Sequence, residues 1–335
     1  MDLQSAILII EVVFLVVVFF CRIYCLDVGR LLCRMYCLDV GQPVKSPTNS
    51  TGNHYPETNL SKILIITVND LEIQAVVTAF ETAAEQKARV FTKGDRTYQD
   101  LGIVNDSQVF MAISEMGSQG LGASHQTTQK AIAALRPHAV FAVGIAFGID
   151  EKKRQIGDIL VSQQLMLYEL QRVGQKESVL SWLIRFLKPE QSVKARIILR
   201  GDRPHGSDAL ISFLKNTKQS WQKDVGVHFG LVLSGEKLVD NLDYRDSLKK
   251  LEPEAIGGEM EGTGVYVSCQ DAKVNWIVVK AICDWADGNK GQDKTQRQSL
   301  AAKNAADFIV HALQQTTLPR THIPSDIVPV AKKTK

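Results

Sequence analysis

The sequence has too few cysteines for a disulfide-bonded scaffold. It contains six, of which four lie before residue 38 and only Cys269 and Cys283 lie in the rest of the chain. Two cysteines cannot build the disulfide framework of a small secreted protein, so the main part of the chain is predicted to be cytoplasmic. The four early cysteines are spaced CxxxC twice without a neighbouring histidine, whereas structural zinc sites usually use closer pairs. We therefore expect no metal site.

A strong excess of one charge is also absent. The chain has 39 Lys and Arg against 36 Asp and Glu, a net charge of +3, and no basic run is interleaved with aromatic residues. Nucleic-acid-binding domains usually show a basic surface, so nucleic acid is not an expected partner. The hydrophobic fraction of 45% and the charged fraction of 22% are ordinary for a globular protein, which excludes wholesale disorder.

No apolar run clearly reaches the length of a membrane span. Residues 6–21 are apolar except for Glu11, but this run is shorter than the ~20 residues that a spanning helix needs. A signal peptide would begin with basic residues, whereas Asp2 is the only charge before the run. Basic residues follow it instead, beginning at Arg22, which would keep the downstream chain in the cytoplasm. Three interpretations stay open: a signal anchor, a cleaved signal, and an extension that never meets a membrane.

Composition divides the chain into four segments. Residues 1–41 hold the apolar run and a direct repeat, CRIYCLDVG and CRMYCLDVG, to which we assign no function. Residues 42–60 are rich in Pro, Ser, Thr and Asn, which indicates a linker. Residues 316–335 are polar and predicted to be disordered. Residues 61–315 remain as one large folded domain.

Apolar strands alternate with helical segments through this domain. Strands are expected at 62–68, 107–114, 138–145, 157–163, 195–201, 226–235 and 276–282, and the main helices at 71–80, 122–135, 261–272 and 296–313. This alternation predicts an α/β fold, a three-layer sandwich with a mixed, mostly parallel central sheet between helices. Ligands in such folds bind at the carboxyl ends of the strands.

Two early strand ends carry residues of interest. Glu72 follows the first strand in TVNDLE, where its position alone favours a role as the partner of Asn69 in a capping box. The third strand runs into GIAFG at 144–148, where glycine would let the backbone approach a ligand. A tight turn would need the same glycines. The GSQGLG segment at 117–122 does not have the order of a dinucleotide-binding motif.

Two later segments place carboxylates near strands. GGEMEGTG holds Glu261 between glycines just before a helix, which favours a ligand-facing carboxylate over the solvated pair that two glutamates usually form. The last strand runs into Asp284 and Asp287 in AICDWADG. Aspartates at such positions are also common turn residues, so neither is decisive alone.

Together and in this order, the four segments resemble the nucleoside phosphorylase superfamily over residues 62–315. The combination of a glutamate after the first strand, GIAxG, EMEG and a strand ending in Ser-Asp or Cys-Asp is similar to the methylthioadenosine/S-adenosylhomocysteine nucleosidase-like branch. The resemblance implies the phosphorylase/nucleosidase fold, cleavage of a purine N-glycosidic bond and no cofactor. Members of this family usually form homodimers in which each subunit completes the partner's site.

The resemblance also implies a role for each matching residue. Glu72 corresponds to the glutamate that activates the attacking water, and Asp284 to the acid that protonates N7 of the leaving purine. Glu261 holds the ribose hydroxyls, and Met260 packs on the ribose. The sugar and base pocket is lined by the loop that contains Gly144, Ile145, Ala146 and Phe147.

This chemistry requires carboxyl groups. The bond breaks through an oxocarbenium-like sugar, as in the hydrolysis of O-glycosides. A departing purine is a poor anion, so an acid must supply a proton, and a second carboxylate must orient the water. A carboxylate that bridges two sugar hydroxyls also places negative charge near the developing cation.

Two departures from the family pattern bear on the reaction. The hexameric phosphorylases hold phosphate with arginines that TVNDLEIQ and the residues before Gly144 lack, which favours water as the nucleophile. Phe147 replaces the glycine of GIAGG, and this ring could close part of the pocket or change the base specificity.

The substrate is predicted from three segments, 234–241, GGEMEG and 280–290. They are most similar to a subgroup found in immune and conflict proteins, some of which release adenine from ATP. A triphosphate would need cations, which are available in Arg172, Arg200, Arg203 and Lys237, although surface solvation is the simpler interpretation of each. The alternatives are a methylthioadenosine/S-adenosylhomocysteine nucleosidase, a phosphate-dependent purine nucleoside phosphorylase and a non-catalytic nucleoside-sensing module.

Overall fold

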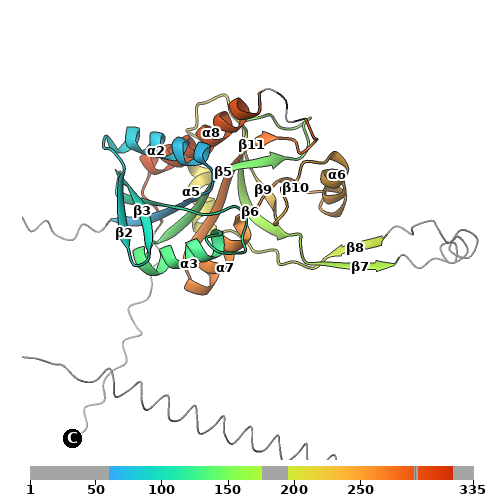
Figure 1. The fold of residues 1–335 in the computed structure, drawn as a ribbon. Coiled ribbons are helices and arrows are strands. Elements are labelled where there is room, and N and C mark those ends of the chain that lie inside the picture. The colour runs from blue at the N-terminus through green and yellow to red at the C-terminus, as the bar shows by residue number, and fades with distance from the viewer. Residues whose placement is uncertain (1–59, 176–194, 290, 292, 320–335) are drawn as a thin grey trace, which may run out of the picture. The chain divides into compact units, whose positions relative to one another are not determined.

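The computed structural model describes residues 60–175, 195–289, 291 and 293–319 (Figure 1). The predicted membrane-attached segment 6–21, the cysteine repeat and nearly all of the linker lie outside these residues, as does most of the segment 316–335. Within the described ranges, no helix has the length and apolar character needed to cross a bilayer. Membrane attachment through residues 6–21 stays a prediction, which a fluorescent fusion to residues 1–60 tests: a diffuse signal in cells would discard it.

A nine-stranded mixed sheet forms the centre of the fold. Its order is β10-β9-β6-β11-β5-β1-β4-β3-β2, and an additional pairing of β10 with β5 closes five of the strands into a ring. β1 pairs in parallel with β4 and β5, and β5 with β11, whereas β10 pairs antiparallel with β5 and β6 with β11. The hairpins β2–β3 and β3–β4 are also antiparallel. The strands are β1 (Ser61–Thr67), β2 (Arg89–Lys93), β3 (Arg96–Val104), β4 (Ser107–Ile113), β5 (Ala139–Gly148), β6 (Ile159–Leu167), β9 (Val227–Ser234), β10 (Ala255–Glu259) and β11 (Asn275–Asp284).

Helices cover both faces of the sheet, which confirms the predicted three-layer α/β fold (Figure 1). One layer consists of α2 (Asp70–Ala84), α5 (Asp208–Lys218) and α8 (Lys294–Gln315), and the opposite layer of α3 (Ser124–Leu135) and α7 (Gly262–Ala272). The helix α6 (Leu242–Leu251) packs beside β9 and β10.

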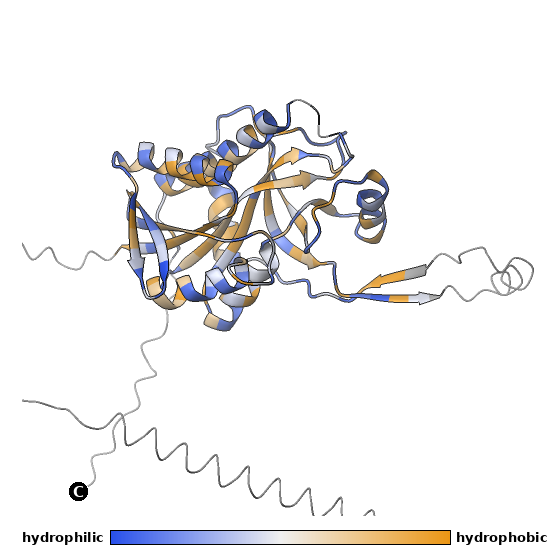
Figure 2. Cartoon of the chain, viewed as in Figure 1, coloured by the Kyte–Doolittle hydropathy of each residue, from blue (hydrophilic) through white to orange (hydrophobic). Residues whose placement is uncertain are grey.

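The alternation of side chains along each strand divides the apolar core in two. In β1, Ile63 and Ile65 face the α2/α5/α8 layer, whereas Leu64 and Ile66 face α3 and α7. All four side chains are buried. Successive side chains of a strand point to opposite faces, so an uninterrupted apolar run is what a strand between two helical layers requires. Figure 2 shows the resulting band of hydrophobic strands.

A two-stranded arm projects from this body. It consists of β7 (Gln171–Gln175) and β8 (Ala195–Leu199), which pair only with each other (Figure 1). The strand expected at 195–201 therefore exists but does not join the central sheet. Several apolar side chains of the arm are exposed, including Leu170 at its base and Val173, which is 67% exposed.

Glycines permit β10 to cross against β5. A Cβ at Gly257 would lie 2.4 Å from Leu160 Cδ1, and one at Gly258 would lie 2.3 Å from Phe147 Cζ. No side chain fits at such distances, so these two positions require glycine for packing. Their close approach brings Met260 and Glu261, which follow directly, next to the end of β5.

Candidate active site

A cavity of about 390 Å³ lies where β1, β5, β10 and β11 end. Its volume lies within the range of small-molecule pockets. Most of the residues predicted to form the site line it: Glu72, Ile145, Ala146, Phe147, Lys237, Met260, Glu261 and Asp284. The strand ends that were widely separated in the sequence therefore form one site.

Gly144, by contrast, does not line the cavity, and glycine is required there for a steric reason. A Cβ at this position would lie 2.0 Å from Glu72 Oε1, so only glycine lets that carboxylate reach β5. Phe147, which replaces the glycine of the family pattern, is buried and packs against Gly258. The ring thereby forms part of the cavity wall next to β10.

Glu72 has both a structural contact and a position in the cavity. Its Oε2 accepts hydrogen bonds from the backbone N–H groups of Val68 (2.9 Å) and Asn69 (3.3 Å), and Asn69 Oδ1 accepts from the Glu72 N–H, which forms the capping box of α2. Its Oε1 turns inward and accepts from the Ile145 N–H at 2.8 Å. The capping box thus fixes the side chain through Oε2, and Oε1 contacts β5 and lies near Lys280 where Glu72 lines the cavity.

Glu261 is held at the start of α7 by contacts from several elements. Its Oε1 accepts from the Gly117 N–H at 3.3 Å, and its backbone N–H donates to Glu259 Oε2 at 2.9 Å. Ser124 Oγ donates to its carbonyl at 2.8 Å. Glu261 is buried, so its carboxylate has a fixed position beneath the cavity.

Lys280 joins the two carboxylates and was not singled out from the sequence. Its Nζ lies 2.9 Å from Glu261 Oε2 and 3.7 Å from Glu72 Oε1, and the residue is 1% exposed. The signal available in the sequence was a lysine within the apolar strand WIVVKAI. A lysine is almost never fully buried unless it is paired, so this position alone indicated buried carboxylates nearby.

The charges around Lys280 keep it protonated. Burial acts to lower its pKa, but the negative charges of Glu261, Glu72 and Glu259 outweigh burial and hold the pKa above its ordinary value. The ammonium group can therefore offset part of the repulsion between the two cavity carboxylates.

Glu259 supplies a third buried carboxyl group. Burial, followed by the charge of Glu261, raises the pKa of Glu259 to about 7. Its Oε2 accepts from the N–H groups of Glu261 and Gly262. Near that pH Glu259 is only partly ionised, so it contributes part of a negative charge beside Lys280.

Asp284 ends β11 and is only partly buried. Its Oδ1 accepts from the Ala286 N–H at 3.0 Å, and the thiol of Cys283 donates to its Oδ2 at 3.4 Å. Burial, then the neighbouring Asp284 charge, raises the pKa of the Cys283 thiol. Cys283 thus stays a neutral thiol beside the carboxyl group. Asp287, in the same turn, does not line the cavity.

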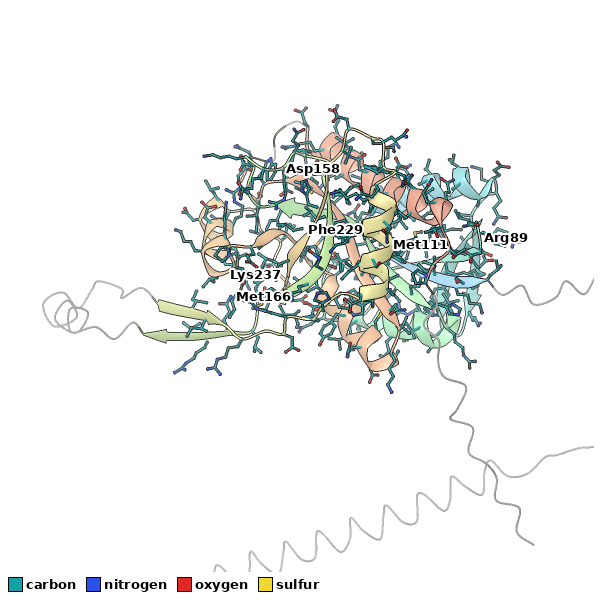
Figure 3. The ribbon with its side chains drawn as sticks, turned by 180° about the vertical axis from the view of Figure 1, so that it is seen from behind. Arg89, Met111, Asp158, Met166, Phe229 and Lys237 are labelled. Atoms are coloured by element: carbon teal, nitrogen blue, oxygen red, sulfur yellow. The ribbon has the colours of Figure 1, made fainter. Side chains whose placement is uncertain are left out.

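Three of the four cations predicted to bind phosphate lie outside the cavity. Arg172 and Arg200 are exposed on the arm or at its base, and Arg203 pairs with Glu252; none of the three lines the cavity. Lys237, which is labelled in Figure 3, does line it, but its Nζ contacts the carboxylate of Glu169, two residues before β7. Within the described part of the chain, no group of three or more His, Cys, Asp or Glu residues could hold a metal ion.

Residues 62–314 match the sequence profile of the phosphorylase superfamily. The match covers most of the chain and contains every element that builds the cavity. The chain therefore belongs to this superfamily.

Individual relatives fall into two groups by name. The chain is 28% identical over 276 residues to a death domain-containing ATP nucleosidase of Amphimedon queenslandica. The alignment covers 75% of this chain and 48% of that protein. It is 22% identical over 213 residues to a 5′-methylthioadenosine/S-adenosylhomocysteine nucleosidase of Staphylococcus carnosus, covering 64% and 84%. The chain thus spans about half the length of the ATP nucleosidase.

The fold is also similar to solved structures. The 5′-methylthioadenosine/S-adenosylhomocysteine nucleosidase of Neisseria meningitidis, in complex with methylthio-immucillin-A, superposes with a TM-score of 0.59 at 18% identity. The superposition covers 77% of this chain and 100% of that one. At this identity the likeness establishes the fold.

Proposed function

We propose that the chain hydrolyses the N-glycosidic bond of an adenine nucleoside or nucleotide and releases free adenine. The observation that carries this proposal is the pairing of Glu72 and Glu261 with one buried Lys280, on the strand that ends in Asp284. Two carboxylates against one ammonium leave negative charge at the cavity floor. Such fixed charge stabilises an oxocarbenium-like sugar as the bond to the base breaks.

Each carboxyl group then has a separate task. Asp284 donates a proton to N7 of adenine while the electrons of the C1′–N9 bond move to the base. Glu261 binds the ribose hydroxyls, and Met260 packs on the sugar. Glu72 takes a proton from a water molecule whose oxygen bonds to C1′. The hydrogen bonds to Val68 and Ile145 support this last role because they hold the Glu72 carboxylate in one position at the cavity.

Water is the proposed nucleophile. Among the residues that the structure describes, no arginine lines the cavity, and Lys280 and Lys237 already pair with carboxylates. Lys294 lies on the exposed wall, apart from the buried Glu72 and Glu261 that face the reacting sugar. We expect adenine to be released in phosphate-free buffer, together with free ribose or a 5′-phosphorylated ribose. Chromatography of the reaction mixture measures both products. A strict requirement for phosphate, with ribose 1-phosphate as the product, would identify a phosphorylase instead.

Glu72→Gln tests the water-activating role against capping alone. A glutamine oxygen can still accept from the Val68 and Asn69 N–H groups, so the melting temperature should change little. An amide cannot take the proton from water, so kcat should fall by about 100-fold or more. Normal turnover by this variant would leave Glu72 with the capping role only.

Among adenine substrates we favour nucleotides such as ATP. The Amphimedon queenslandica relative, named as an ATP nucleosidase, supports this choice, as does the similarity of residues 234–241 and 280–290 to proteins that release adenine from ATP. The Staphylococcus carnosus relative supports a thioether nucleoside instead. A comparison of kcat/KM for ATP, AMP, adenosine and methylthioadenosine distinguishes them. A clear preference for methylthioadenosine would contradict the nucleotide assignment.

We also propose that the active form is a homodimer. The rim of the cavity has exposed apolar side chains, Met116 (54%) and Leu238 (67%), and the base of the adjoining arm has Leu170 and Val173. The Lys237–Glu169 contact links these two regions. A second copy that covers them would bury apolar surface and complete the cavity wall. Light scattering during gel filtration should give twice the monomer mass, and a fully active monomer would contradict this proposal.

A further inference from the structure

One wall of the cavity is polar and faces solvent. It consists of Asn69 at the start of α2 with Lys294 and Gln298 at the start of α8. Asn69 and Gln298 are partly exposed and Lys294 is exposed, whereas Glu72, Glu261 and Lys280 lie buried at the floor. A ligand that reaches from the floor to this wall therefore passes from the buried interior to water.

Lys294 differs from the other two lysines of the site. Lys280 is neutralised by two buried carboxylates, and Lys237 contacts Glu169. Lys294, by contrast, forms no ion pair with any residue that the structure describes. It is thus a cation at the cavity whose charge is available to a ligand. Its place in the first turn of α8 adds the positive end of the helix dipole.

The stereochemistry of a nucleoside places its 5′ carbon on the side of this wall. The base and C5′ lie on the same face of a D-ribose ring, and the 2′ and 3′ hydroxyls lie on the other. Glu261, which would bind the hydroxyls, lies with Glu72 and Lys280 at the buried floor, whereas Lys294 lines the exposed wall. With the hydroxyl face of the ribose on this floor and the base at Asp284, C5′ points away from the floor and toward the wall that holds Lys294.

We propose that the Asn69–Lys294–Gln298 wall is a subsite for the 5′-phosphate groups of an adenine nucleotide, with Lys294 as the residue that selects them. This inference rests on the proposed function and identifies its substrate class. A thioether substituent would prefer an apolar wall, whereas a phosphate prefers a cation and amide donors. Lys294 thereby replaces Arg200 and Arg203 in the role predicted from the sequence.

Asp70 provides a second, opposite test of the same wall. Its carboxylate is exposed and also lines the cavity, so its charge opposes a bound phosphate. Removing the charge of Lys294 should weaken nucleotide binding, and removing that of Asp70 should strengthen it. Neither change should alter binding of the uncharged adenosine.

The experiment compares Lys294→Gln and Asp70→Asn with Lys303→Gln, a matched control on the same helix whose lysine pairs with Asp307. We expect Lys294→Gln to lower kcat/KM for ATP by about 10-fold or more, the effect of losing one charged hydrogen bond. Its kcat/KM for adenosine should stay within about two-fold of the unchanged chain, as should both values for Lys303→Gln. Inorganic tripolyphosphate should compete with ATP in the unchanged chain and much less in Lys294→Gln.

Calorimetric binding of ATP and adenosine is measured in the Asp284→Asn background, in which substrate is not turned over. If adding Lys294→Gln weakens ATP binding 10-fold and leaves adenosine binding unchanged, the subsite is supported. This holds even if the chain releases no adenine, because the absence of adenine release would contradict only the proposed reaction. Equal losses for ATP and adenosine, or an unchanged ATP affinity, would overturn the subsite while leaving nucleosidase activity in place.

Discussion

Asp284→Asn is expected to lower kcat by about 100-fold or more while the fold remains intact. An amide cannot donate the proton that the departing adenine needs. The asparagine oxygen can still accept the Ala286 N–H bond that shapes the turn, so the melting temperature should change little. Single-turnover adenine release, measured by chromatography, reports the chemical step directly.

Asp287→Asn is the matched control for this prediction. Asp287 lies in the same turn, accepts from the Asn289 N–H at 3.0 Å and does not line the cavity. Its replacement should leave kcat nearly unchanged. If the two variants lose activity equally, Asp284 has a structural role in the turn and the proton donor must be sought elsewhere.

Lys280→Met should have the largest effect on stability. The change leaves Glu72 and Glu261 buried without their shared cation, and breaking a buried ion pair in this way costs about 3–5 kcal/mol. We therefore expect a much lower denaturation midpoint in urea and loss of activity. The hydrophobic replacement occupies a similar volume, so the effect reports charge and not a cavity.

A double variant separates this charge effect from simple misfolding. Adding Glu261→Gln to Lys280→Met removes one of the uncompensated carboxylates and should recover part of the lost stability, but not activity. Strict additivity of the two losses would show that Lys280 and Glu261 do not interact. Lys280→Arg, which keeps the charge, should be more stable than Lys280→Met.

The arrangement of the central strands follows directly from local sequence. The runs around Ile63, Phe141 and Val278 are apolar at successive positions because helices cover both faces of the sheet. Glu72 follows the first of these strands, Gly144 lies in the second and Asp284 ends the third, so the rule that ligands bind near strand ends predicted that these positions lie close together. The hairpin of β2 and β3 gave no comparable signal, since it lies at the exposed edge of the sheet and carries alternating polar residues.

The sequence alone determined the α/β fold, the positions of its main strands and the carboxyl groups that surround one cavity, because strand periodicity is a local property. The ends of two strands were wrong: β5 and β6 run to Gly148 and Leu167, beyond the expected 145 and 163, because their last residues pair with strands distant in sequence. Only the tertiary structure decided which cations accompany those carboxyl groups. A lysine or arginine has a long side chain, and its partner is set by segments far away in sequence: Glu252 for Arg203, Glu169 for Lys237, and Glu72 and Glu261 for Lys280. Lys294 reaches the cavity because α8 packs beside α2, a contact between residues more than 200 positions apart.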